Sequence, residues 1–154
     1  MRAAGFLLVT LGACSSQVDS YCERTCGKKA VCMPGFDKQA CKNECQSASS
    51  TVVPLIRSDY LDALLECIRT AECTATDACA TKARSAITGS ALSQTFCTSY
   101  VAALISCGLS SSDQATCVDK HKIYADDVLK RSNACLTRTC VELPSCVTNV
   151  LVPP

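Results

Sequence analysis

The chain has 154 residues and nearly balanced charge, with 15 Lys and Arg residues against 14 Asp and Glu residues. Because nucleic acids and anionic membrane surfaces are bound through concentrated basic charge, this balance argues against both as direct partners. Trp is absent, and there are only 3 Phe and 4 Tyr residues, which predicts a thin hydrophobic core. The 15 cysteines are about a tenth of the chain, a content typical of exported disulfide scaffolds.

The N-terminal segment combines a basic start, an apolar stretch and a cysteine that follows two small residues. Arg2 precedes the apolar stretch, which ends in Leu11-Gly12-Ala13-Cys14. This segment resembles the signal peptide and lipobox of bacterial lipoproteins. The resemblance implies that residues 1–13 are removed and that Cys14 becomes a lipidated N-terminus. The apolar stretch is shorter than the roughly 20 residues that a membrane-spanning helix needs.

Ser15 follows the lipobox cysteine, where an Asp would retain a lipoprotein at the inner membrane of a two-membrane bacterium. The resemblance therefore implies an exported protein that is anchored to the bacterial cell envelope, at the outer membrane, through residues 14–19 as a lipidated tether. Lipidation of Cys14 would leave an even number of other cysteines, which a fully oxidised framework requires.

The cysteines recur at nearly constant intervals, which indicates an internal duplication. Three matches share one interval to within a single position: Cys22 with Cys97, Cys32 with Cys107 and Cys41 with Cys117. Three later matches share a slightly shorter interval: Cys67 with Cys135, Cys73 with Cys140 and Cys79 with Cys146. Two copies of a long period favour tandem small units over a solenoid. We expect one cysteine-rich helical repeat over 20–89, a linker over 90–94 and a second repeat over 95–154.

Two cysteines of the first copy have no counterpart in the second. Cys26 aligns with Val101, and Cys45 aligns with His121. A joint loss is most simply the loss of both ends of one bridge, because a single leftover thiol would be reactive in an oxidising compartment. The sequence therefore predicts a Cys26–Cys45 disulfide.

A helix hairpin turning at Pro34-Gly35 would bring the cysteines nearest the turn together first. This geometry predicts the bridge Cys32–Cys41 and its counterpart Cys107–Cys117. The other cysteines allow three pairings in each copy, which the sequence does not rank. They are Cys22, Cys67, Cys73 and Cys79 in the first copy, and Cys97, Cys135, Cys140 and Cys146 in the second.

Two Cys-x3-Cys pairs, Cys22 with Cys26 and Cys41 with Cys45, each place two thiols on one helical face. The pairs resemble the twin motif of small chaperones of the mitochondrial intermembrane space. That resemblance implies the nested bridges Cys22–Cys45 and Cys26–Cys41. The joint loss in the second copy favours the other pairing.

Capping residues and helical periodicity predict an all-α fold of disulfide-stapled units, and strand signals are weak. The helix starts expected in the first copy are Ser20 with Glu23 as a capping box, Asp37, Ser58 and Thr76. In the second copy, we expect a helix that ends at Gly108, and a long helix that begins at Ser112 and runs past Val128 and Leu129.

Motifs for catalysis or metal binding are absent from the sequence. There is no Cys-x2-Cys, and His121 is the only histidine, which argues against zinc and against thiol–disulfide oxidoreductase chemistry. We interpret His121 as a boundary residue because Asp119 and Asp126 are poorly placed to orient it. No nucleophile elbow, phosphate loop or metalloprotease motif occurs. The sequence therefore predicts no catalytic residue, no cofactor and no metal ligand.

These observations favour a lipid-anchored, extracytoplasmic, disulfide-rich protein that binds a partner or builds the envelope and is not an enzyme. The expected partners are the membrane, through the lipid, and an unidentified envelope protein. The first alternative is a carrier of a small apolar ligand or lipid, because disulfide-stapled helices can enclose an apolar cavity. The second alternative is an enzyme of unrecognised type.

Overall fold

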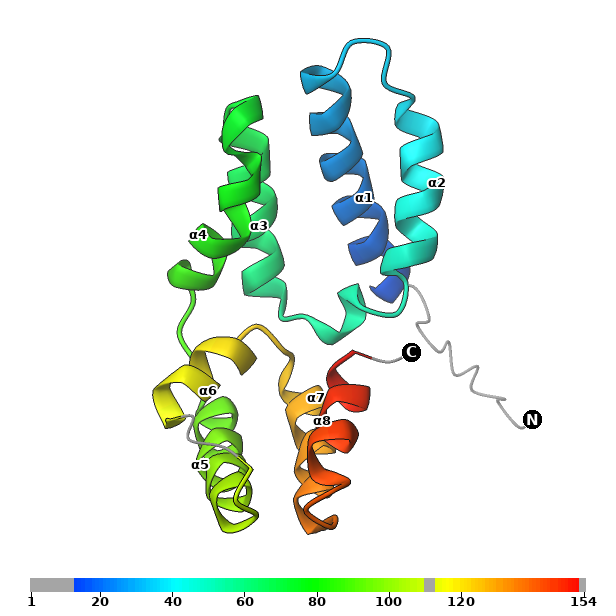
Figure 1. Ribbon diagram of the computed structural model, residues 1–154. Helices are drawn as coiled ribbons and strands as arrows, with labels where there is room; N and C mark the ends of the chain where they lie inside the picture. Colours follow the sequence, from blue (N-terminus) through cyan, green and yellow to red (C-terminus); the bar gives the residue numbers. More distant parts are fainter. Residues whose placement is uncertain (1–12, 110–112, 153–154) are drawn as a thin grey trace, which may run out of the picture.

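The computed structural model describes residues 13–109 and 113–152, and these residues form an all-α, disulfide-stapled fold (Figure 1). The prediction of the fold class is therefore confirmed. None of the helices described combines the length and the hydropathy needed to cross a bilayer.

Each half of the chain contributes four helices, and the two halves lie at opposite ends of the molecule (Figure 1). The first half contains α1 (Ala13–Cys32), α2 (Lys38–Ser49), α3 (Ser58–Thr70) and α4 (Cys79–Ala86), with 3-10 helices at Val53–Leu55 and Cys73–Ala78. The second half contains α5 (Ala91–Ser106), α6 (Gln114–His121), α7 (Asp126–Asn133) and α8 (Leu143–Leu151), with a 3-10 helix at Ala134–Thr137.

The turn between α1 and α2 follows the sequence signals closely. Gly35 has a φ of 78°, a left-handed conformation that favours glycine, and Asp37 caps α2 by accepting a hydrogen bond from the Ala40 amide. The start of α1 differs from the prediction. Ser20 and Glu23 lie inside α1, which has already begun at Ala13, so they form no capping box.

The prediction of a single long helix from Ser112 is wrong. Asp113 caps α6 by accepting from the Thr116 amide, and Ser112 lies outside the described residues. The chain leaves the helical conformation after α6, and α7 begins only at Asp126. The helix is interrupted because the Ile123 carbonyl and the Ala125 amide form hydrogen bonds with the first half.

The connection between the halves is shorter than the predicted linker. Ser90 caps α5 by accepting from the Ser93 amide, so residues 90–94 include the cap and first turn of α5. Gly89 lies in the connection itself. A Cβ there would approach the Val118 Cγ1 atom to 2.7 Å, so a side chain cannot fit unless neighbouring atoms move.

The two halves meet through equivalent residues. Ile56 and Tyr124 form an isolated antiparallel bridge, and the interval between them equals the interval between Cys67 and Cys135. The Arg57 amide donates to the Ile123 carbonyl at 2.9 Å, and the Ala125 amide donates to the Leu55 carbonyl at 2.9 Å. Each of these bonds is the counterpart of the other in the repeat alignment, so the bridge lies on a local two-fold axis between the repeats.

Side chains are exchanged across this junction in the same reciprocal way. Leu55 belongs to the main core cluster of the second half, where Phe96 and Leu129 are fully buried. Its equivalent, Ile123, packs against the cluster of Tyr60, Ala83 and Ile87 in the first half. The halves are therefore interlocked.

Candidate functional site

Seven disulfides fix the described part of the chain, and each joins cysteines of the same half. They are Cys22–Cys45, Cys26–Cys41, Cys32–Cys73 and Cys67–Cys79 in the first half, and Cys97–Cys117, Cys107–Cys140 and Cys135–Cys146 in the second. This framework indicates an oxidising, extracytoplasmic location.

The predicted bridge Cys26–Cys45 is wrong. Residues four apart lie on one helical face, so the two Cys-x3-Cys pairs of α1 and α2 face each other. They form two nested disulfides, which we call rungs. Cys22 pairs with Cys45 and Cys26 with Cys41, which is the arrangement that the twin-motif resemblance implied.

The predicted bridges Cys32–Cys41 and Cys107–Cys117 are also wrong. Cys32 is the last residue of α1, and Cys41 is already bonded to Cys26 further back along that helix. The end of α1 instead reaches the 3-10 helix that follows α3, where Cys32 bonds to Cys73. Cys107–Cys140 is the equivalent bridge in the second half.

The second half joins α5 to α6 through one bridge, Cys97–Cys117. By the repeat alignment, these residues correspond to Cys22 and Cys41, which belong to two different rungs in the first half. The loss of counterparts to Cys26 and Cys45 therefore removed one end of each rung, and the two remaining cysteines pair diagonally.

The predicted lipidation site lies at the edge of the described residues. Leu11 and Gly12 lie outside them, and Cys14 belongs to the first turn of α1. Residues 14–19 are helical, so the expected tether is the beginning of α1. The bridged cysteines are all the cysteines of the chain except Cys14.

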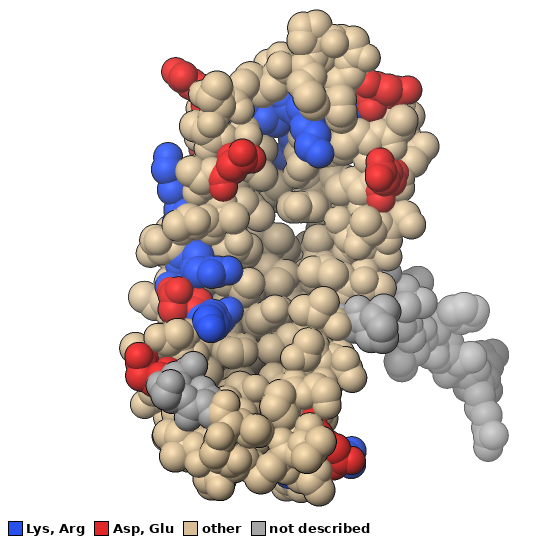
Figure 2. Space-filling view, viewed as in Figure 1, with Lys and Arg blue, Asp and Glu red and all other residues tan. Residues whose placement is uncertain are grey.

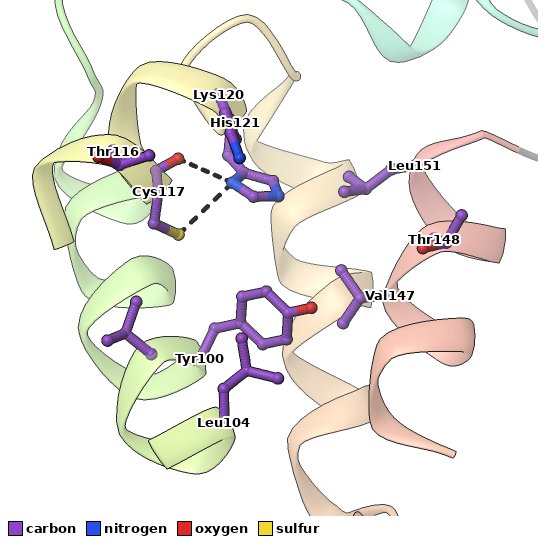
Figure 3. A pocket seen from close by; sticks show the side chains of 10 residues that line it. Tyr100, Leu104, Thr116, Cys117, Lys120, His121, Val147, Thr148 and Leu151 are labelled. Atoms are coloured by element: carbon purple, nitrogen blue, oxygen red, sulfur yellow. Dashed lines mark hydrogen bonds between the residues drawn. The ribbon is translucent and has the colours of Figure 1, made fainter. Parts of the chain in front are cut away.

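A pocket of about 230 Å³ lies beside the Cys97–Cys117 bridge, between α5, α6 and α8 (Figure 3). Its lining consists of Tyr100, Val101, Leu104, Thr116, Cys117, Lys120, His121, Val147, Thr148 and Leu151. Figure 3 shows the Tyr100 ring beneath the imidazole of His121, with the hydroxyl pointing toward α8. The pocket therefore combines aliphatic walls with a few polar groups, as small-molecule sites usually do.

His121 is the most enclosed polar group of this pocket. Its Nδ1 lies 2.8 Å from the Cys117 carbonyl oxygen and 3.4 Å from the Cys117 Sγ. The Phe96 ring packs edge-on against the imidazole, with ring centroids 5.4 Å apart. Burial lowers the pKa of His121 below its usual value, so the imidazole is neutral at neutral pH. Sequence reasoning placed this residue at a boundary and missed its position beside the disulfide.

The groups nearest His121 are bonded to other partners. Cys97, Cys117 and His121 place the atoms that could bind a metal within 4.8 Å of one another. The two sulfurs form a disulfide, however, whereas cysteine binds metals as a thiolate. Asp119 pairs with Lys122, and Asp126 accepts from the Ser90 hydroxyl. Within the described residues, neither carboxylate orients the imidazole.

Comparisons with protein-family models, with curated proteins and with solved structures give no match.

Proposed function

We propose that the protein is a lipid-anchored, extracytoplasmic binding protein of a bacterial cell envelope. The observation that carries this proposal is the cysteine arrangement. The bridges use every cysteine but Cys14, and Cys14 is the one that closes the lipobox. A thiol without a bridge partner would be a liability in an oxidising compartment, whereas thioether linkage to lipid removes that thiol.

A binding role is supported by the character of the scaffold. The bridges hold pocket walls from different helices in place, which reduces the conformational entropy lost when a ligand binds. The neutral imidazole of His121 has no carboxylate to orient it within the described residues, and the neighbouring sulfurs are oxidised. An enzyme of unrecognised type remains the weaker candidate because no other observation favours it.

Lipidation is tested by metabolic labelling with a fatty-acid analogue in a two-membrane bacterial host. We expect label on the wild-type protein and on Ser16→Ala, a neighbouring control, and no label on Cys14→Ala. Mass spectrometry of the labelled protein should place the modification on the first residue of a chain that has lost residues 1–13. Labelled Cys14→Ala would contradict the proposal.

The membrane assignment has its own test, because the residue after the lipobox cysteine can be changed. We expect the wild-type protein in the outer-membrane fraction and Ser15→Asp in the inner-membrane fraction. Wild-type protein in the inner membrane would leave the lipid anchor in place and reject the outer-membrane location.

A further inference from the structure

A second hollow, of about 460 Å³, lies in the first half between α1, the end of α3 and the 3-10 helix Cys73–Ala78. This volume is in the range of about 300–1,000 Å³ that is common for small-molecule pockets. The bridge Cys32–Cys73 lines it together with Thr25, Lys28 and Lys29. Figure 2 shows Lys and Arg side chains gathered in the hollow between the upper helices.

The equivalent positions of the second half hold residues of its apolar cluster. By the interval that relates Cys22 to Cys97, the counterparts of Thr25, Lys28 and Lys29 are Tyr100, Ala103 and Leu104. By the shorter interval of the later cysteines, the counterparts of Ile68 and Thr76 are Leu136 and Leu143. All five counterparts belong to the apolar cluster of the second half or pack against it. The first half keeps the same bridge but has polar or charged side chains at most of these positions.

The lining of the hollow combines polar and apolar side chains. The Lys28 ammonium is half-buried and donates to the Ala71 carbonyl, and Lys29 is exposed at the rim. The Thr25 Oγ1 atom is buried and has no hydrogen-bond partner among the described residues. Met33, whose amide donates to the Lys29 carbonyl, and Ile68 of α3 also line the hollow, and Met33 is 44% exposed although it is apolar.

We propose that this hollow binds a single-chain anionic amphiphile, such as the carboxylate of a medium-length fatty acid. Lys28 and Lys29 would bind the anionic head group, since charge-assisted hydrogen bonds are the strong ones. The aliphatic tail would cover Met33 and Ile68. Asp77 is the one acidic lining residue, so the two lysines leave the lining with a net positive charge. The inference rests on the binding role proposed above but not on lipidation.

The first test measures ligand class. The protein is the mature chain, residues 14–154, with Cys14→Ala, exported to an oxidising compartment behind a cleavable signal and kept free of detergent. Calorimetric titration with sodium decanoate below its micellar concentration should show one saturable site. Decanol and decyltrimethylammonium keep the tail but lose or reverse the charge, and we expect each to bind at least about tenfold more weakly. Acetate, which keeps only the head group, should show no measurable binding.

The second test locates the site. Lys28→Met with Lys29→Met should weaken decanoate binding at least about tenfold. Lys29→Leu with Thr76→Leu copies residues of the second half into the hollow and should abolish binding by filling it. Lys130→Met removes an exposed lysine that does not line the hollow and should leave affinity unchanged. Lys29→Met alone tests the same idea if the double variant does not fold, because Lys29 is exposed.

Several results would overturn the inference. These are no saturable decanoate binding, equal affinity for decanol, affinity that is insensitive to both lysines, or a loss of affinity in Lys130→Met. Preferential binding to vesicles of anionic two-chain phospholipid over free decanoate would reject a single-chain ligand. Because lipidation is scored separately by labelling Cys14, a failed titration would leave the anchored-protein proposal standing.

Discussion

The two halves of the chain share a helix order but are stabilised in different ways. The second half has one continuous core, with Phe96, Val128 and Leu129 fully buried, and three bridges. The first half divides its buried residues into two small clusters and has four bridges. The comparison indicates that an additional covalent link can replace apolar burial. It also agrees with the polar lining of the hollow in the first half, at positions where the second half has residues of its apolar cluster.

The largest expected difference concerns two equivalent leucines, Leu61 and Leu129. Leu129→Ala should lower the free energy of unfolding by about 4 kcal/mol because it leaves a cavity in a fully enclosed core. Leu61 lies in a small cluster and is slightly exposed, so Leu61→Ala should cost about 2 kcal/mol. Urea unfolding of both variants measures the two values. Leu129→Met is the control and should cost under about 1.5 kcal/mol. Equal losses for the two alanine variants would contradict the unequal cores.

The bridges between the paired helices should show a similar contrast. Removing Cys97–Cys117 with two alanines deletes the one bridge between α5 and α6, and we expect a loss of about 3 kcal/mol. Removing Cys26–Cys41 leaves the enclosing bridge Cys22–Cys45, which already restricts the unfolded chain. That variant should lose less than about 2 kcal/mol. Urea unfolding, with the other bridges verified by peptide mapping, decides between this order and the reverse.

Local signals in the sequence predicted most of the helical architecture. The Pro34-Gly35 turn, the Asp37 cap and the glycine after α5 each act within a few residues, so a linear pattern contains them. Gly108, with a φ of 68°, ends α5 as expected.

Features that depend on contacts between distant residues could not be obtained in this way. The bridge pattern depends on which residues of α1 and α2 face each other in the folded protein. The inference from the two cysteines that the second copy lacks therefore predicted the wrong pairs. The break between α6 and α7 depends on a bond between Leu55 and Ala125, which lie in different halves of the chain. The repeat interval that relates Ile56 to Tyr124 was present in the sequence, but nothing local marks these residues as partners.

Substitutions at the junction between the halves should have a smaller effect on the free energy of unfolding, and hydrogen exchange can locate that effect. Leu55→Ala removes a side chain that the second half buries, and we expect a loss of about 2 kcal/mol. Its counterpart Ile123→Ala should lose somewhat less because Ile123 is only half-buried. Hydrogen exchange should show faster exchange at the Arg57 and Ala125 amides in both variants. Faster exchange confined to the mutated half would contradict reciprocal exchange of side chains across the junction.

The smallest expected effect is on the pH dependence of stability. It arises in the second half, which contains the only histidine of the chain. His121 occupies the position of Cys45, which is bridged in the first half. Burial lowers the pKa of His121 in the folded protein, while in the unfolded chain the pKa is about 6.5. As the pH falls below about 6.5, the unfolded state therefore takes up a proton before the folded state does, and stability decreases. Above that pH, both states are neutral and the contribution is constant.

Comparison with His121→Gln isolates this contribution, because the chain has no second histidine. Thermal unfolding at pH 7.5 and at pH 5 should show a larger fall in Tm for the wild-type protein than for His121→Gln. Glu23, whose pKa is lowered to about 2 by hydrogen bonds to Lys38 and Lys42, keeps its charge in the folded state across this range. The contribution of Glu23 to stability falls only as the pH approaches the usual pKa of a glutamate side chain. This contribution is the same in the wild-type protein and in His121→Gln. Parallel Tm curves would mean that protonated His121 is accommodated as easily as the neutral form, and the pocket beside Cys97–Cys117 would then be more open to water than its aromatic neighbours indicate.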